Sequence, residues 1–99
     1  MNANLNNQTI RLYGFIDVCL DFFQALREEA LERISTLKES PDNITAEKLS
    51  PPGFWNELTA NDRRLVGLCF SFMVKLGLLP LVKLKIKKDN RNQYRFANA

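Results

Sequence analysis

Two groups of basic side chains are the residues of this 99-residue chain best suited to bind a ligand. Arg63 and Arg64 lie side by side near the start of an apolar run. Further on, three lysines alternate with apolar residues, at Lys83, Lys85 and Lys87. A guanidinium group can make two parallel hydrogen bonds to a base edge or a phosphate, whereas a lysine acts as a point charge on the phosphate backbone. These residue types predict contacts with nucleic acid.

The charge distribution favours the same prediction. The formal net charge is only +3, but residues 1–50 carry eight acids and five bases, whereas residues 51–99 carry three acids and nine bases. Such an asymmetry indicates that the second half faces a polyanion. The alternative is a solvated basic face that binds nothing.

Residues for catalysis are not evident in the sequence. The chain has no histidine, and Cys19 and Cys69 are isolated within apolar patterns, so we interpret them as reduced core residues rather than metal ligands. Asp17 and Asp21 are four residues apart, which a solvated helix face explains better than an acid–base pair. We therefore expect no enzyme activity, no metal, no cofactor and no small-molecule substrate.

The first half of the chain predicts one long helix. Residues 1–8 are rich in asparagine and are expected to be disordered, and residues 9–40 are expected to form an amphipathic helix used for packing or dimerisation. Its apolar stripe steps by four and three residues and is the candidate dimer or partner interface, consisting of Leu12, Ile16, Cys19, Phe23, Leu26 and Ala30. The alternatives are that this helix folds over the domain core alone, or that it breaks near Gly14.

The middle of the chain predicts a break, a short helix and a second break. Ser40 and Pro41 end the first helix, because proline removes a backbone donor. Residues 44–49 then form a short helix with Thr45 as its cap, and a proline-rich stretch follows it. We interpret Phe54 and Trp55 as core anchors between helices, with a stacking platform for bases as the alternative.

A second long helix is predicted after Thr59. The Thr59 side chain can accept a hydrogen bond from the first helical turn, and Gly77 can take the left-handed position that follows a helix. Between them we expect Val66, Phe70 and Val74 at the side of the helix. The predicted core face consists of Leu65, Leu68, Cys69, Phe72, Met73 and Leu76.

A basic hairpin is predicted at the end of the chain. Residues 82–88 alternate between apolar and basic side chains, a turn follows at residues 89–92, and residues 94–96 form the return strand. Period-two alternation turns the apolar members toward the core together with Tyr94 and Phe96. The other face then carries the three lysines, with Arg95 continuing it from the return strand.

This order of elements resembles winged helix-turn-helix domains over residues 44–96. The motif is the run M-V-K-L-G-L-L (residues 73–79), followed by the basic hairpin that ends in Q-Y-R-F (residues 93–96). More narrowly, the chain resembles a small bacterial and phage family of winged-helix-like proteins that has no assigned activity. That narrower likeness is carried by Trp55, Leu58, Arg64, Gly67, Phe70, Gly77 and Tyr94, with Lys88 and Asn90 near the turn.

The resemblance implies a mainly α fold with a small C-terminal β-hairpin, in the α+β class, in which residues 41–99 form the winged-helix-like domain. It also implies that the start of the second long helix enters the major groove of DNA and that the hairpin contacts phosphates or the minor groove. The candidate nucleic-acid-binding residues are then Asn61, Arg63, Arg64, Lys83, Lys85, Lys87, Lys88, Arg91 and Arg95.

The expected function is duplex DNA binding by a dimeric regulatory or accessory protein. The alternative is a protein–protein interaction module on the same scaffold, for example a phage or mobile-element protein that inhibits or adapts a host complex. Arg64 also has a structural alternative, an ion pair with Glu57 or Asp62. The chain has no apolar run long enough to cross a bilayer and no apparent signal peptide, so we expect a cytoplasmic protein without membrane contact.

Overall fold

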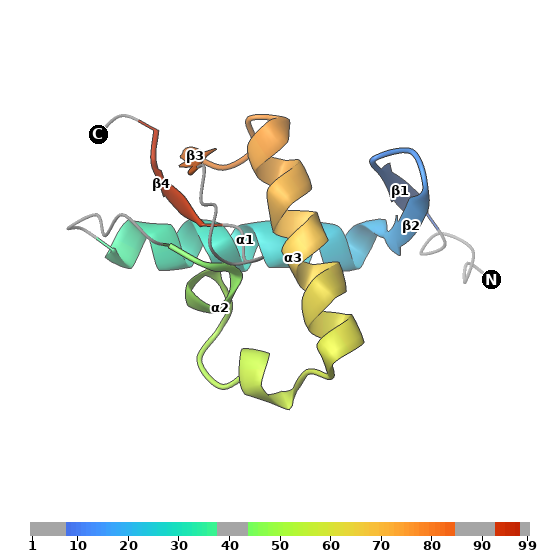
Figure 1. Ribbon diagram of the computed structural model, residues 1–99, viewed down its shortest axis with the longest axis horizontal. Helices are drawn as coiled ribbons and strands as arrows, with labels where there is room; N and C mark the ends of the chain where they lie inside the picture. The colour runs from blue at the N-terminus through green and yellow to red at the C-terminus, as the bar shows by residue number, and fades with distance from the viewer. Residues whose placement is uncertain (1–7, 38–43, 85–92, 98–99) are drawn as a thin grey trace.

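The computed structural model describes residues 8–37, 44–84 and 93–97 (Figure 1). Within these residues the chain combines helices with two small antiparallel sheets, so the α+β class is confirmed. The elements in chain order are β1 (Thr9–Leu12), β2 (Ile16–Cys19), α1 (Leu20–Thr36), α2 (Ala46–Leu49), the 3-10 turn η2 (Trp55–Glu57), α3 (Ala60–Lys75), β3 (Leu81–Lys83) and β4 (Tyr94–Phe96).

The N-terminal segment is a β-hairpin, so the prediction of one helix over residues 9–40 is wrong. β1 and β2 pair antiparallel with Leu12 opposite Ile16. Between them Tyr13 and Gly14 both have positive φ, of 53° and 83°, and the Phe15 N–H donates to the Leu12 carbonyl at 3.1 Å. A right-handed helix cannot pass through two such residues, but a tight hairpin turn requires them. The break near Gly14 is therefore confirmed.

Helix α1 keeps the second half of the predicted stripe. Its buried residues are Phe23, Leu26 and Ala30, at the three- and four-residue spacing of one helix face. Figure 1 shows α3 crossing the middle of α1, with the β1–β2 hairpin on one side of α3 and the β3–β4 pair on the other. The buried face of α1 is thus covered by elements of its own chain.

Tyr13 packs the β1–β2 hairpin against α3. Its hydroxyl lies 2.6 Å from Ser71 Oγ, and its ring meets Phe72 edge-on with centroids 5.1 Å apart. The ammonium group of Lys75 lies 5.3 Å from the centre of the same ring. A non-glycine residue at positive φ costs about 1–3 kcal/mol. These three contacts offset that strain and explain why a tyrosine occupies the position.

Removing the Tyr13 hydroxyl tests this contact. We expect Tyr13→Phe to lower the free energy of unfolding by about 1 kcal/mol, because Ser71 loses its partner while the ring contacts remain. Urea unfolding of the single variants Tyr13→Phe and Ser71→Ala and of the double variant measures the coupling, which should be about 1 kcal/mol. Equal costs of Tyr13→Phe in the presence and absence of Ser71 would show that the two hydroxyls do not interact.

Both predicted ends of α3 are confirmed. The Thr59 side chain accepts a hydrogen bond from the Asp62 N–H at 3.1 Å, as an N-cap does. Gly77 follows the helix with φ of 77°. The Leu78 N–H donates to the Met73 carbonyl at 2.8 Å and the Gly77 N–H to the Val74 carbonyl at 3.1 Å, which is the Schellman pattern.

The core face of α3 is rotated from the predicted one. The buried residues of the helix are Val66, Cys69, Phe70 and Met73. Leu76, expected in the core, is 52% exposed, whereas Phe70, expected at the side, is fully buried. The rotation brings Phe70 inward because α3 is packed on two sides, by α1 with the hairpin and by the C-terminal strands (Figure 1).

The C-terminal strand pair exists but has a different inward face. β3 pairs antiparallel with β4, with Leu81 opposite Phe96 and Lys83 opposite Tyr94. Leu81 and Tyr94 are buried whereas Val82 is only half-buried, so the expected inward set beginning at Val82 is wrong in the described part of the strand. On its other edge β4 is bridged by Ile44, through two backbone hydrogen bonds with Tyr94 of 2.9 and 2.8 Å.

Candidate functional site

The first turns of α3 carry the polar residues that were predicted to contact DNA, Asn61, Arg63 and Arg64. Asn61 and Arg64 are exposed, and Arg64 Nη1 donates to Asn61 Oδ1 at 3.1 Å. This bond replaces the ion pair with Glu57 or Asp62 that was the alternative for Arg64. The pair lies on adjacent turns of one helix face, so both side chains can approach the same ligand.

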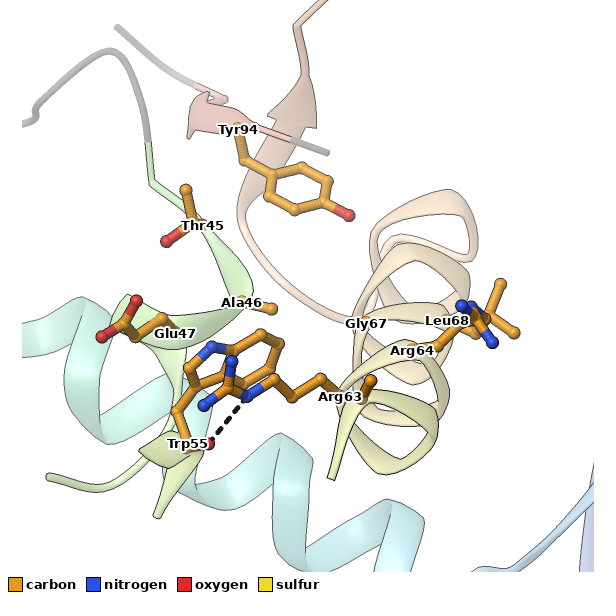
Figure 2. A pocket seen from close by; sticks show the side chains of 10 residues that line it. Thr45, Ala46, Glu47, Trp55, Arg63, Arg64, Gly67, Leu68 and Tyr94 are labelled. Atoms are coloured by element: carbon orange, nitrogen blue, oxygen red, sulfur yellow. Dashed lines mark hydrogen bonds between the residues drawn. The ribbon is translucent and has the colours of Figure 1, made fainter. Parts of the chain in front are cut away.

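The Arg63 side chain contacts Trp55. Its Nε donates to the Trp55 carbonyl oxygen at 3.0 Å, and its guanidinium carbon lies 5.5 Å from the centre of the indole ring (Figure 2). Both residues are half-buried, and Trp55 packs against the core. Arg63 therefore holds η2 against α3, which supports the interpretation of Trp55 as an anchor.

A pocket of about 560 Å³ lies beside this contact. Figure 2 shows it between the start of α2, Trp55, the N-terminal half of α3 and β4. Its size is within the range of small-molecule sites. The residues that line it are Thr45, Ala46, Glu47, Trp55, Ala60, Arg63, Arg64, Gly67, Leu68 and Tyr94.

The predicted basic ribbon is only partly within the described residues. Lys83 is exposed, and Arg95 is half-buried with its Nη1 donating to the Phe96 carbonyl at 3.2 Å. Val82 is the residue opposite Arg95, so Lys83 and Arg95 lie on opposite faces of the strand pair. The remaining four predicted contacts, Lys85, Lys87, Lys88 and Arg91, lie outside the described residues.

The predicted dimer or partner interface is distributed over three elements. Of its six residues, Leu12, Phe23, Leu26 and Ala30 are buried in the core of the chain itself. Ile16 is half-buried and Cys19 is exposed. In the described residues the exposed large apolar side chains are different ones, which the helical periodicity of the sequence did not single out as a surface: Phe15, Phe22, Leu31 and Leu76.

An ion pair and burial account for the pKa shifts of Asp17 and Cys69. Asp17 accepts hydrogen bonds from Arg11 at 2.8 and 3.0 Å, and the bonded guanidinium holds the pKa of this carboxyl below its ordinary value. Asp17 lies on β2 and Asp21 on α1, so they do not share a helix face. Burial raises the pKa of the Cys69 thiol to about 11, which keeps it protonated at neutral pH. Within residues 8–37, 44–84 and 93–97 no group of three or more acidic or cysteine side chains could hold a metal ion.

Comparison with known proteins adds no relative. No family model, no curated protein and no solved structure matches the chain. In the part of the chain that the structure describes, no helix combines the length and the hydrophobicity needed to cross a membrane.

Proposed function

We propose that the chain is a winged-helix-like protein that binds duplex DNA through the start of α3 and the C-terminal hairpin. The observation that carries the proposal is the exposed Asn61–Arg64 pair on the first turns of α3, a helix that is packed on two sides. Such a pair can reach base edges or phosphates, since asparagine and arginine are the side chains that read adenine and guanine in the major groove.

The arrangement of elements around α3 supports this proposal. The chain continues from α3 into β3 and β4, the helix, strand, strand order of the resemblance. Ile44, between α1 and α2, adds a third segment beside β4. The basic excess of residues 51–99 lies in the same half of the chain. Because most of the predicted dimer stripe is buried, the proposal is made for a single chain.

The proposal limits what Arg63 contributes. Its Nε donates to the Trp55 carbonyl oxygen and its guanidinium lies over the indole ring, so its role is to position η2 beside α3. Arg64 is then the arginine that approaches DNA. A substitution of Arg64 should weaken DNA binding. A substitution of Arg63 should lower the stability of the fold, because it removes the contact with Trp55.

Fluorescence anisotropy of a labelled random-sequence duplex, measured at several salt concentrations, tests the proposal. Log affinity should fall with log salt by about 0.9 for each phosphate neutralised. Arg64→Ala should weaken binding by roughly fivefold to tenfold and reduce the slope by about one unit. Lys85→Ala/Lys87→Ala should flatten the slope by about two units if both lysines contact phosphates.

Lys75→Ala is the matched control, because it removes one positive charge from the opposite end of α3. Lys75 lies over Tyr13, far along the helix from Asn61. We expect it to change affinity much less than Arg64→Ala does. Equal losses in both variants would mean that only net charge matters, and no binding at about 50 mM salt would contradict the proposal altogether.

A second candidate is a protein-interaction module. The observation that favours it is Phe15, which is 69% exposed in the turn of the N-terminal hairpin. Contiguous exposed apolar patches mark partner surfaces, and Phe15 is the most exposed of the four large apolar side chains at the surface of the described residues. Phe15→Ser should leave DNA affinity unchanged if DNA binding is the function. Failure of the natural chain to bind the duplex would instead favour the interaction module.

A further inference from the structure

Gly67 is a glycine that the fold of α3 does not require. It lies inside the helix and does not have positive φ, and a Cβ atom added to it would meet no atom of the described residues within 4 Å, its chain neighbours and the backbone of its own helix aside. A glycine in a helix interior costs about 1 kcal/mol relative to alanine. Neither backbone conformation nor close packing explains that cost. The open space beside Gly67 is the pocket that it lines.

Arg63 presents a fixed guanidinium group at the same pocket. The bond to the Trp55 carbonyl uses its Nε, and its guanidinium carbon lies 5.5 Å from the centre of the indole ring (Figure 2). In the described part of the chain this leaves the N–H groups on its two terminal nitrogens to meet a ligand. A guanidinium held in place before binding loses little entropy when an anion arrives.

The other walls of the pocket suit a flat apolar body. Ala46, Ala60 and Leu68 supply aliphatic surface, and Trp55 and Tyr94 supply aromatic surface. Among the described residues that line the pocket, the one acidic side chain is exposed Glu47, whose carboxylate extends away from α3 in Figure 2. The two arginines therefore set the charge of the pocket.

We infer that this pocket binds a planar organic anion, whose acidic group meets Arg63 and whose flat body lies against the helix at Gly67. Gly67 keeps the space that the body needs, because any side chain there would project into it. The inference concerns a small ligand and does not depend on the proposed DNA binding.

The fluorescence of Trp55 tests this inference directly, because it is the single tryptophan of the chain. The probe is anilinonaphthalene sulfonate, a flat aromatic anion, and the matched neutral compound is phenylnaphthylamine. We expect saturable quenching of Trp55 by the anion, with an affinity about tenfold above that of the neutral compound, since a charge-assisted hydrogen bond is lost. Equal affinity for both compounds, or no saturable quenching, would overturn the inference.

Gly67→Ala separates binding from stability. The added methyl group should raise the melting temperature by roughly 2–6 °C, because alanine is the better helix former. The same variant should weaken binding of the anion by about fivefold to tenfold, because it narrows the pocket. A more stable variant with unchanged affinity would show that the probe binds elsewhere.

Arg63→Gln, with Lys75→Ala as its control, tests the anion contact. We expect Arg63→Gln to weaken binding of the sulfonate and not of its neutral counterpart. A loss that is the same for both compounds would instead reflect a displaced Trp55 and would overturn the assignment. Lys75 is not among the residues that line the pocket and lies at the other end of α3, so Lys75→Ala should leave the affinity for the sulfonate unchanged. The titrations contain no DNA, so their failure and the failure of the proposed function are distinguishable.

Discussion

Replacing Phe70 by alanine is expected to lower the free energy of unfolding by about 3–5 kcal/mol. Phe70 is fully buried in the core, where it belongs to the same cluster as Leu26 and Tyr94. Removing its ring loses the free energy of burying an apolar surface and leaves a cavity that the packed neighbours fill only in part. For a domain of this size that loss is a large share of the total stability of about 5–15 kcal/mol.

Leu76→Ala is the control for this prediction. Leu76 is 52% exposed at the end of α3, so its loss should cost less than about 1 kcal/mol. Helical periodicity predicted the reverse order, with Leu76 in the core and Phe70 at the side. Guanidinium unfolding of both variants decides between the two arrangements, and a larger cost for Leu76→Ala would show that α3 has the orientation predicted from the sequence.

Cys69 is expected to make the stability of the protein fall in alkaline solution. Burial raises the pKa of its thiol from 9.0 to about 11. Because the folded state holds the proton more tightly than the unfolded state, this stability is fully present below pH 9 and is lost as the pH rises toward 11. The loss should be about 1–2 kcal/mol, since the solvent screens part of the effect.

Cys69→Ala isolates this contribution from other groups that titrate in the same range. The variant should be less stable than the natural chain at neutral pH, because a buried sulfur is lost. Its unfolding free energy should fall less steeply than that of the natural chain between pH 9 and 11. Parallel pH profiles would mean that the thiol titrates normally in the folded state.

Local signals in the sequence determined where α3 begins and ends. Thr59 and Gly77 were recognised from residue type alone, since a cap hydroxyl and a left-handed glycine act on the adjacent backbone. The spacing of Phe23, Leu26 and Ala30 likewise identified the buried face of α1. These features depend on neighbours within a few residues, which a sequence displays directly.

The N-terminal hairpin was not predicted, because the spacing of its apolar residues is compatible with a helix as well as with strands. Leu12, Ile16 and Cys19 continue the helical stripe by their spacing, whereas β-branched residues and Gly14 favour strands and a turn. The contact of Tyr13 with Ser71, 58 residues away in the sequence, helps to decide the matter. Periodicity within the segment could not include a contact of such long range.

Only the tertiary structure decided how α3 is oriented and what its arginines do. A helix that is apolar nearly all round has no unique inward face, so its neighbours on two sides select Phe70 over Leu76. The same packing brings Trp55 under Arg63 and leaves Arg64 at the surface. The sequence by itself determined that two arginines lie at the start of a helix. Their separate roles follow from which elements pack beside them, because burial and hydrogen bonding depend on neighbours that the sequence does not place in space.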